Sequence, residues 1–102
     1  MDEYLSKIYE VSRTFPKDEI YGLTSQIRRS ALSIILNYIE GYARNRKTVL
    51  KTFLEISYGS LKETKYLYFS FKQKYINQKN YQELSCLGEE IGAMLWGILR
   101  NV

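Results

Sequence analysis

The chain has 102 residues, of which 45% are hydrophobic, and a formal net charge of +4. This length predicts one domain, residues 1–102, and the hydrophobic content excludes a disordered chain. No run approaches the roughly 18 apolar residues of a membrane helix. A basic segment followed by an apolar one is also missing from the N-terminus, which argues against a secretory signal. We therefore expect a cytoplasmic protein without a membrane partner.

The charge is unevenly distributed. Residues 28–79 contain eleven basic and three acidic side chains, a local sum of +8, whereas the remainder sums to −4. The middle of the chain is therefore the candidate face for a polyanion such as RNA. The alternative is that these lysines only solvate a long helix.

Catalytic and metal-binding residue types are scarce. The sequence contains no histidine, which removes the usual general base and the commonest metal ligand. Its single cysteine, Cys86, fits a reducing compartment and is predicted to be a small core residue. Glu40 and Glu63 are isolated carboxylates, which is weak evidence for a magnesium site. We predict no catalytic residue, no metal and no cofactor, and hence a protein that is not an enzyme.

The first predicted helix covers residues 2–14. Leu5, Ile8 and Tyr9 recur at helical spacing. Phe15 precedes Pro16, and the residue before a proline disfavours helical geometry, so the helix should end here. Residues 17–22 are expected to form a connection with a helical turn.

The second predicted helix, residues 23–42, has two different faces. One is an apolar arc of roughly 160°, interrupted by Arg28 and formed by Ile27, Ala31, Leu32, Ile34, Ile35, Tyr38, Ile39 and Tyr42. Such a wide arc predicts burial against sister helices and against another subunit. The other face is a narrower polar stripe of Gln26, Arg29, Ser33, Asn37, Glu40 and Arg44.

Two hypotheses account for the polar stripe. It is either a row of ligand-binding side chains or a structural network at the contact between the second and third helices. We favour the network, because the stripe mixes both signs of charge and buried charges require partners. Its members are predicted to be Gln26, Arg29, Asn37, Glu40 and Glu63, with Arg29 neutralised by the two carboxylates.

A basic turn, Arg44 to Lys47, leads into a third helix predicted over residues 47–75, with Asn45 as its cap. One side of this helix carries a basic stripe interleaved with aromatic residues. The candidate nucleic-acid-binding residues are Arg44, Arg46, Lys47, Lys51, Lys62, Lys65, Tyr58 and Phe69. Lysines contact phosphates and aromatic rings stack on bases. The pattern fits equally well a solvated face whose aromatic residues belong to an oligomer interface.

The fourth predicted helix follows a turn at residues 77–80, with Asn80 as its cap. One face carries Leu84, Leu87, Ile91, Leu95 and Ile98, and Gly88 and Gly92 beside that face permit a close helix approach. Four helices joined by short turns predict an all-α, antiparallel up-down four-helix bundle with helices about 20° apart.

Several of these residues also carry a family resemblance. They are the run from Gly22 to Ala31, then Ser33-Ile34, Asn37, Glu40-Gly41, Arg44, Phe53-Leu54, Gly59-Ser60 and Glu63. Together they resemble the signature of the four-helix-bundle proteins encoded by intervening sequences of bacterial 23S ribosomal RNA genes. The sequence departs from that signature at Ile35, Tyr38 and Ile39, which add bulk to the central helix.

The resemblance implies a homopentamer. It also implies kinship with the accessory proteins of diversity-generating retroelements, which bind RNA and reverse transcriptase. We therefore expect a non-enzymatic homo-oligomer that presents basic surface to RNA or to an RNA-bound protein such as a reverse transcriptase. The alternative is a purely structural protein–protein assembly module that binds no nucleic acid.

Overall fold

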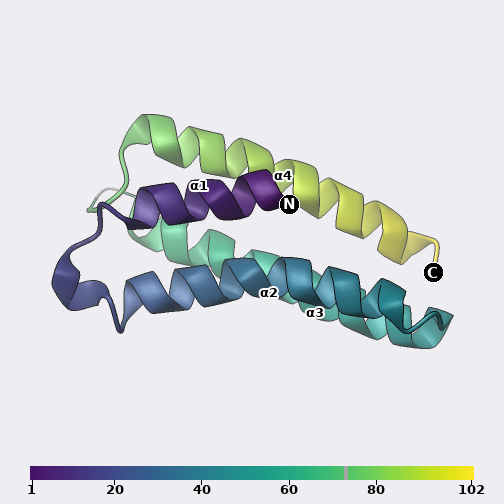
Figure 1. Ribbon diagram of the computed structural model, residues 1–102. Helices are drawn as coiled ribbons and strands as arrows, with labels where there is room; N and C mark the ends of the chain where they lie inside the picture. Colours follow the sequence, from purple (N-terminus) through teal and green to yellow (C-terminus); the bar gives the residue numbers. More distant parts are fainter. Residues whose placement is uncertain (73) are drawn as a thin grey trace.

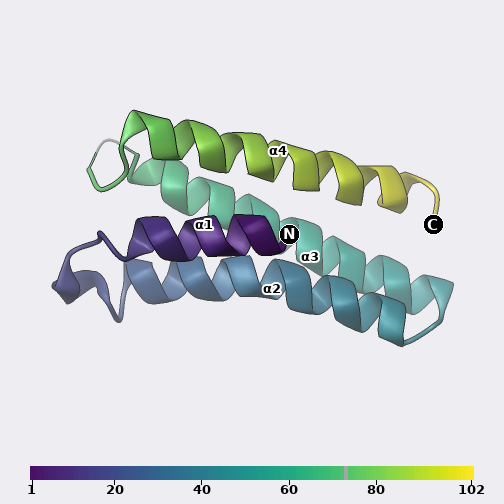
Figure 2. The ribbon, with the colours of Figure 1, turned by 45° about the horizontal axis from the view of Figure 1, so that its top comes forward.

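The computed structural model describes residues 1–72 and 74–102, and in these residues it is an all-α bundle of four helices without strands. Its centre is an antiparallel pair of long helices, α2 (Leu23–Ala43) and α3 (Lys47–Ser70), which run side by side in Figures 1 and 2 and share the largest interface. The predicted four-helix bundle is confirmed. No helix in the described ranges is both long enough and apolar enough to cross a bilayer.

A three-residue turn joins α2 to α3. Asn45 has a positive φ of 54°, a left-handed conformation that asparagine tolerates better than most residues. Arg46, which is extended, occupies the position before the first turn of α3. The prediction that Asn45 caps α3 is therefore wrong, because this residue reverses the chain direction after α2 instead.

The first helix, α1 (Asp2–Ser12), is about half as long as the others and is followed by a 3₁₀ turn, η1 (Lys17–Glu19). It lies between α2 and α4 and reaches only to the middle of the bundle (Figure 1). Arg28, the residue that interrupts the apolar arc, joins α2 to α1. Its Nε donates to the Ser12 hydroxyl at 2.8 Å, and its guanidinium lies 4.6 Å from the centre of the Tyr9 ring.

The connection between α3 and α4 differs from its prediction. Helix α3 ends at Ser70 rather than at Tyr75; Gln73, inside the predicted range, lies outside the described residues. Phe71 leaves helical geometry, and the Tyr75 ring folds back to stack on it with centroids 5.6 Å apart. The two rings therefore pack on each other in a turn and not along a continuing helix.

The last helix, α4 (Gln78–Arg100), begins earlier than predicted. The Asn77 side chain caps it by accepting a hydrogen bond of 2.8 Å from the backbone N–H of Asn80, so the cap is Asn77 and not Asn80. Helix α4 packs on α1 and α3. Past the start of α1, where the chain begins, α4 continues alongside α3 (Figure 2).

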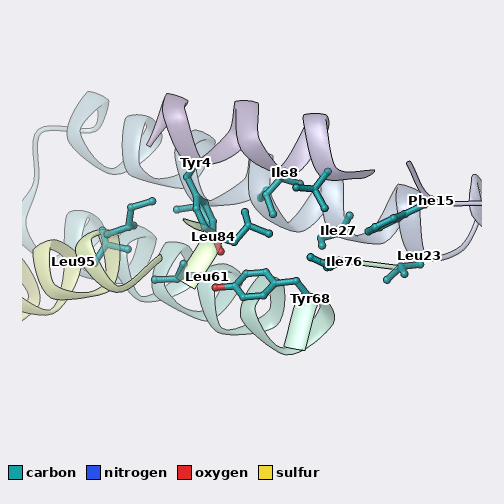
Figure 3. Packing of buried hydrophobic residues seen from close by; sticks show 14 of the residues in the cluster. Tyr4, Ile8, Phe15, Leu23, Ile27, Leu61, Tyr68, Ile76, Leu84 and Leu95 are labelled. Atoms are coloured by element: carbon teal, nitrogen blue, oxygen red, sulfur yellow. The ribbon is translucent and has the colours of Figure 1, made fainter. Parts of the chain in front are cut away.

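The core lies between the four helices, as Figure 3 shows. Among the predicted apolar positions, Leu54 and Leu61 of α3 and Leu84 and Leu95 of α4 are fully buried. At the centre, a Cβ on Gly88 would lie 3.0 Å from the Tyr68 hydroxyl and 3.4 Å from that of Tyr4. The glycine therefore makes room for two tyrosine side chains inside the bundle.

Candidate nucleic-acid interface

The predicted basic stripe is divided into two parts by the structure. Lys62 and Lys65, in the C-terminal half of α3, line a groove with α4. Lys47 and Lys51 are exposed nearer the N-terminus of α3, outside that groove. Arg44 and Arg46 are exposed at the turn, where Arg44 donates to Glu40 at 2.7 Å. The structure thus brings together only part of the predicted set.

The groove between α3 and α4 consists of two adjoining hollows of about 360 and 320 Å³. Both are lined by Lys62, Lys65 and Glu89, so they form one continuous surface along the seam. Its main members, which define the α3–α4 groove below, are Tyr58, Lys62, Lys65, Phe69, Tyr81, Glu89 and Trp96.

Small residues of α4 keep this groove open. Gly92 lies on its floor, where a Cβ would stand 3.4 Å from the Leu61 Cδ2 and 3.7 Å from the Lys65 Nζ. Gly88, Gly92 and Trp96 are four residues apart, so they share one strip of the helix. Of the three, Gly92 and Trp96 line the groove, whereas Gly88 is buried beneath Tyr68 and Lys65.

Lysine side chains lie beside aromatic rings along the groove. The Lys62 ammonium lies 5.2 Å from the centre of the Tyr58 ring. At the other end, Lys72 lies 4.4 Å from the centre of the Phe69 ring and 5.3 Å from that of Tyr81. These distances are within the range of cation–π attraction.

The groove is positively charged overall. Glu89 is the acidic residue of its lining and lies 3.4 Å from the Lys65 ammonium. An exposed pair of this kind contributes little free energy and leaves Lys65 available to another anion. Lys62 adds a further positive charge inside the groove, and Lys72 lies beside the Phe69 and Tyr81 rings at its end.

Sequence reasoning found the α3 side of the groove and missed the α4 side. Trp96 and Tyr81 of α4 were not predicted, because their place beside α3 depends on how the two helices pair. A usable signal existed in the four-residue spacing of Gly88, Gly92 and Trp96. This spacing places Trp96 on the side of α4 whose two glycines face α3.

The predicted polar network of charged residues is wrong. Arg29, Gln26 and Glu63 are exposed, and Glu40 forms its ion pair with Arg44 of its own helix. Burying these charges between α2 and α3 would have cost more hydration free energy than their pairing returns. Asn37 does bond to a backbone group, donating to the Ser33 carbonyl oxygen at 2.8 Å.

Small hydroxyl groups form the contact between α2 and α3 instead. The Ser57 hydroxyl donates to the Ile34 carbonyl oxygen at 2.7 Å, and the Ser33 and Ser60 hydroxyls are 2.8 Å apart. The Thr64 hydroxyl lies 2.8 Å from that of Ser30. Such side chains allow the helices to approach closely and still satisfy their own polar atoms.

A second surface of interest is apolar. Leu32, Leu36 and Ile39 follow one another along the outside of α2, and Leu36 and Ile39 are 54% and 56% exposed. The apolar arc predicted for this helix is thus buried along one edge, at Ile27, Ala31 and Ile34. Its other edge, at Leu32 and Ile39, is exposed to solvent. We refer to Leu32, Leu36 and Ile39 as the α2 apolar stripe.

Cys86 also differs from its prediction. It was expected in the core, but it is exposed and lines a hollow between α1 and α4 beside Lys7, Glu10 and Glu83. Within the part of the chain that the structure describes, no three cysteine or carboxylate side chains gather where they could hold a metal ion.

Comparison with known proteins gives a family. No curated protein matches this chain. The model of the 23S rRNA-intervening sequence protein family matches residues 2–97, which covers all four helices nearly to the end of α4. The chain therefore belongs to the 23S rRNA-intervening sequence protein family.

Proposed function

We propose that this protein is a non-enzymatic, self-assembling helical bundle that presents the α3–α4 groove to RNA. The observation that carries the proposal is that Lys62 and Lys65 line one groove together with aromatic rings of α3 and α4. Lysine ammonium groups neutralise phosphates without reading sequence, so binding should show little sequence preference.

The basic residues outside the groove extend the surface. Lys47 and Lys51 are exposed on α3, the helix that also supplies Lys62 and Lys65, and Arg46 is exposed in the turn before it. In the homopentamer that the family resemblance implies, each subunit would repeat this surface. Several weak contacts on one RNA would then act together through a high effective concentration.

The α2 apolar stripe supports the assembly. Burying one leucine or isoleucine side chain stabilises by about 1.5–3 kcal/mol, and Leu32, Leu36 and Ile39 lie together on the outer side of α2. A second copy of the chain is the occupant we propose for this stripe.

A different function remains as the competing hypothesis. The exposed aromatic rings of Phe69 and Trp96 would also suit a protein–protein contact, because aromatic side chains are enriched in interfaces. The bundle would then be a structural assembly module, and its lysines would only solvate α3. An RNA-bound protein such as a reverse transcriptase would be a partner that satisfies both hypotheses.

Salt-dependent binding to a generic RNA tests the proposal. Affinity should fall steeply as salt rises, by about 0.7 logarithmic units per contacted phosphate for each tenfold increase in salt concentration. The triple variant K51E/K62E/K65E should lose RNA binding while circular dichroism and light scattering show unchanged helix content and assembly.

The matched control is R13E/K17E/K79E, which changes the net charge equally. Its three residues are exposed, and Arg13 and Lys79 lie near Glu10 of α1 rather than in the groove. This variant should bind RNA more tightly than K51E/K62E/K65E. Equal binding by the two variants, or no binding by the parent at low salt, would contradict the proposal and favour the assembly module.

A further inference from the structure

Three exposed aromatic side chains line the α3–α4 groove and are not part of the buried core. Trp96 is 55% exposed, Phe69 is 53% exposed, and Tyr66, which lines the same hollow as Phe69, is the most exposed of the three. Large rings left in water along one basic groove indicate a ligand that covers ring faces. We infer that this groove binds single-stranded nucleic acid with its bases stacked on these rings, Trp96 foremost; the inference rests on the proposed function and specifies its ligand.

The dimensions suit a strand laid along the seam. Tyr58 and Phe69 are eleven residues apart on α3, which corresponds to about 16 Å along the helix. Trp96 lies beside Tyr58 at one end, and Tyr81 lies beside Phe69 at the other. Lys62 and Lys65 stand between the two aromatic ends, where they can contact the phosphates that link successive stacked bases.

A single strand fits these side chains better than a duplex does. Bases in a duplex are already stacked on each other, and their faces are not available to a protein ring. Single strands expose those faces, and every base has one, so stacking tolerates any sequence. The flat floor at Gly92 leaves space beside Trp96 for a planar ring.

An acidic peptide is a weaker candidate for the same groove. Its carboxylates would pair with Lys62 and Lys65, but carboxylates have no extended π-face to cover Trp96 or Phe69. Single-stranded nucleic acid supplies both the negative charge and the planar rings. The arrangement of the groove therefore favours the nucleic acid.

Trp96 provides its own probe, because it is the single tryptophan of the chain. The experiment titrates the full-length protein with a twelve-nucleotide oligouridylate at low salt and follows tryptophan fluorescence. The same titration uses an abasic strand of equal length and charge, a blunt RNA duplex, and polyglutamate. We expect the oligouridylate to quench Trp96 and to bind about tenfold tighter than the abasic strand, since stacking strengthens binding by roughly that factor or more per base.

Variants separate stacking from charge. W96A and W96F lack the tryptophan probe, so their affinities and that of the parent are compared by fluorescence anisotropy of a labelled strand. W96A should bind the oligouridylate about tenfold more weakly than the parent and the abasic strand equally well, whereas W96F should retain most of the affinity. M94A is the matched control, because Met94 is an exposed apolar residue of α4 outside the groove. Circular dichroism of each variant verifies that the bundle is folded.

Equal affinity for the oligouridylate and the abasic strand would overturn the inference and leave the electrostatic proposal standing. Tighter binding of the duplex, or polyglutamate that binds as tightly and quenches Trp96 as fully, would also overturn it. If no nucleic acid binds at low salt, the proposed function fails together with the inference.

Discussion

The Ser57 hydroxyl donates a hydrogen bond of 2.7 Å to the Ile34 carbonyl oxygen and thereby joins α3 to α2 at the centre of their interface. Ser57 is fully buried. Its side chain is small enough for the two helices to approach closely, and its one donor is satisfied by a backbone atom of the neighbouring helix. The α2–α3 pair is thus held by a polar contact that needs no charge.

Replacing Ser57 by alanine should lower the free energy of unfolding by about 1 kcal/mol, because a buried interhelical hydrogen bond is lost. Urea denaturation measures the change. The control is S70A, because the Ser70 hydroxyl bonds to the Tyr66 carbonyl of its own helix and is exposed. Similar losses in both variants would show that the interhelical bond has no special weight.

Gly41 and Gly59 should respond oppositely to the same substitution. A Cβ on Gly41 would lie 3.0 Å from the Phe53 Cβ and 3.1 Å from the Leu50 Cδ1, whereas no described atom lies within 4 Å of a Cβ on Gly59. Overpacking costs about 1–3 kcal/mol, so G41A should destabilise the protein. G59A should stabilise it by about 0.5–1 kcal/mol through lower chain entropy in the unfolded state. Thermal melting of the two variants at equal concentration decides the matter.

Most of the fold could be predicted from the sequence because the helix signals are local. The apolar spacing of Leu54, Leu61, Leu84 and Leu95 places all four in the core without any knowledge of their partners. Helix ends were less predictable. Asn77 and Asn80 are equally good cap residues, and only the packing of Phe71 on Tyr75 ends α3 early enough for Asn77 to cap α4.

The candidate site was predictable on one helix only. Tyr58, Lys62, Lys65 and Phe69 share a side of α3 by simple periodicity, but the contribution of Trp96 depends on which side of α4 meets them. The charged network failed for a different reason. A helical wheel places Arg29 and Glu40 on one stripe, but it does not say that serine and threonine side chains fill the interface and leave the charges in water.

Tyr4→Phe should stabilise the protein by about 1 kcal/mol, since the Tyr4 hydroxyl is buried and has no hydrogen-bond partner among the described residues.

Burial raises the pKa of this hydroxyl above its ordinary value of 10.0, and the neighbouring Tyr68 hydroxyl raises it further. The folded state thus keeps a proton that the unfolded state loses above pH 10.0, so stability is complete below that pH and falls as the pH rises beyond it. Y4F should lose less stability than the parent between pH 8 and pH 11. An equal loss in urea titrations at the two pH values would contradict this explanation.

The α2 apolar stripe should control assembly. The parent is expected to form a species of several chains, five by the family resemblance, instead of the 12.1 kDa monomer. L36K/I39K places two charges on the stripe and should yield monomers, because a buried, unpaired lysine costs far more than the apolar contact contributes. Light scattering at micromolar concentration measures the mass.

I20K/Y21K is the matched control, because it charges two exposed residues in the connection before α2 and should assemble like the parent. A parent of 12.1 kDa would exclude assembly at this concentration. A stripe variant with the mass of the parent would place the subunit interface on another face, and the aromatic residues of the α3–α4 groove would then be the first to examine.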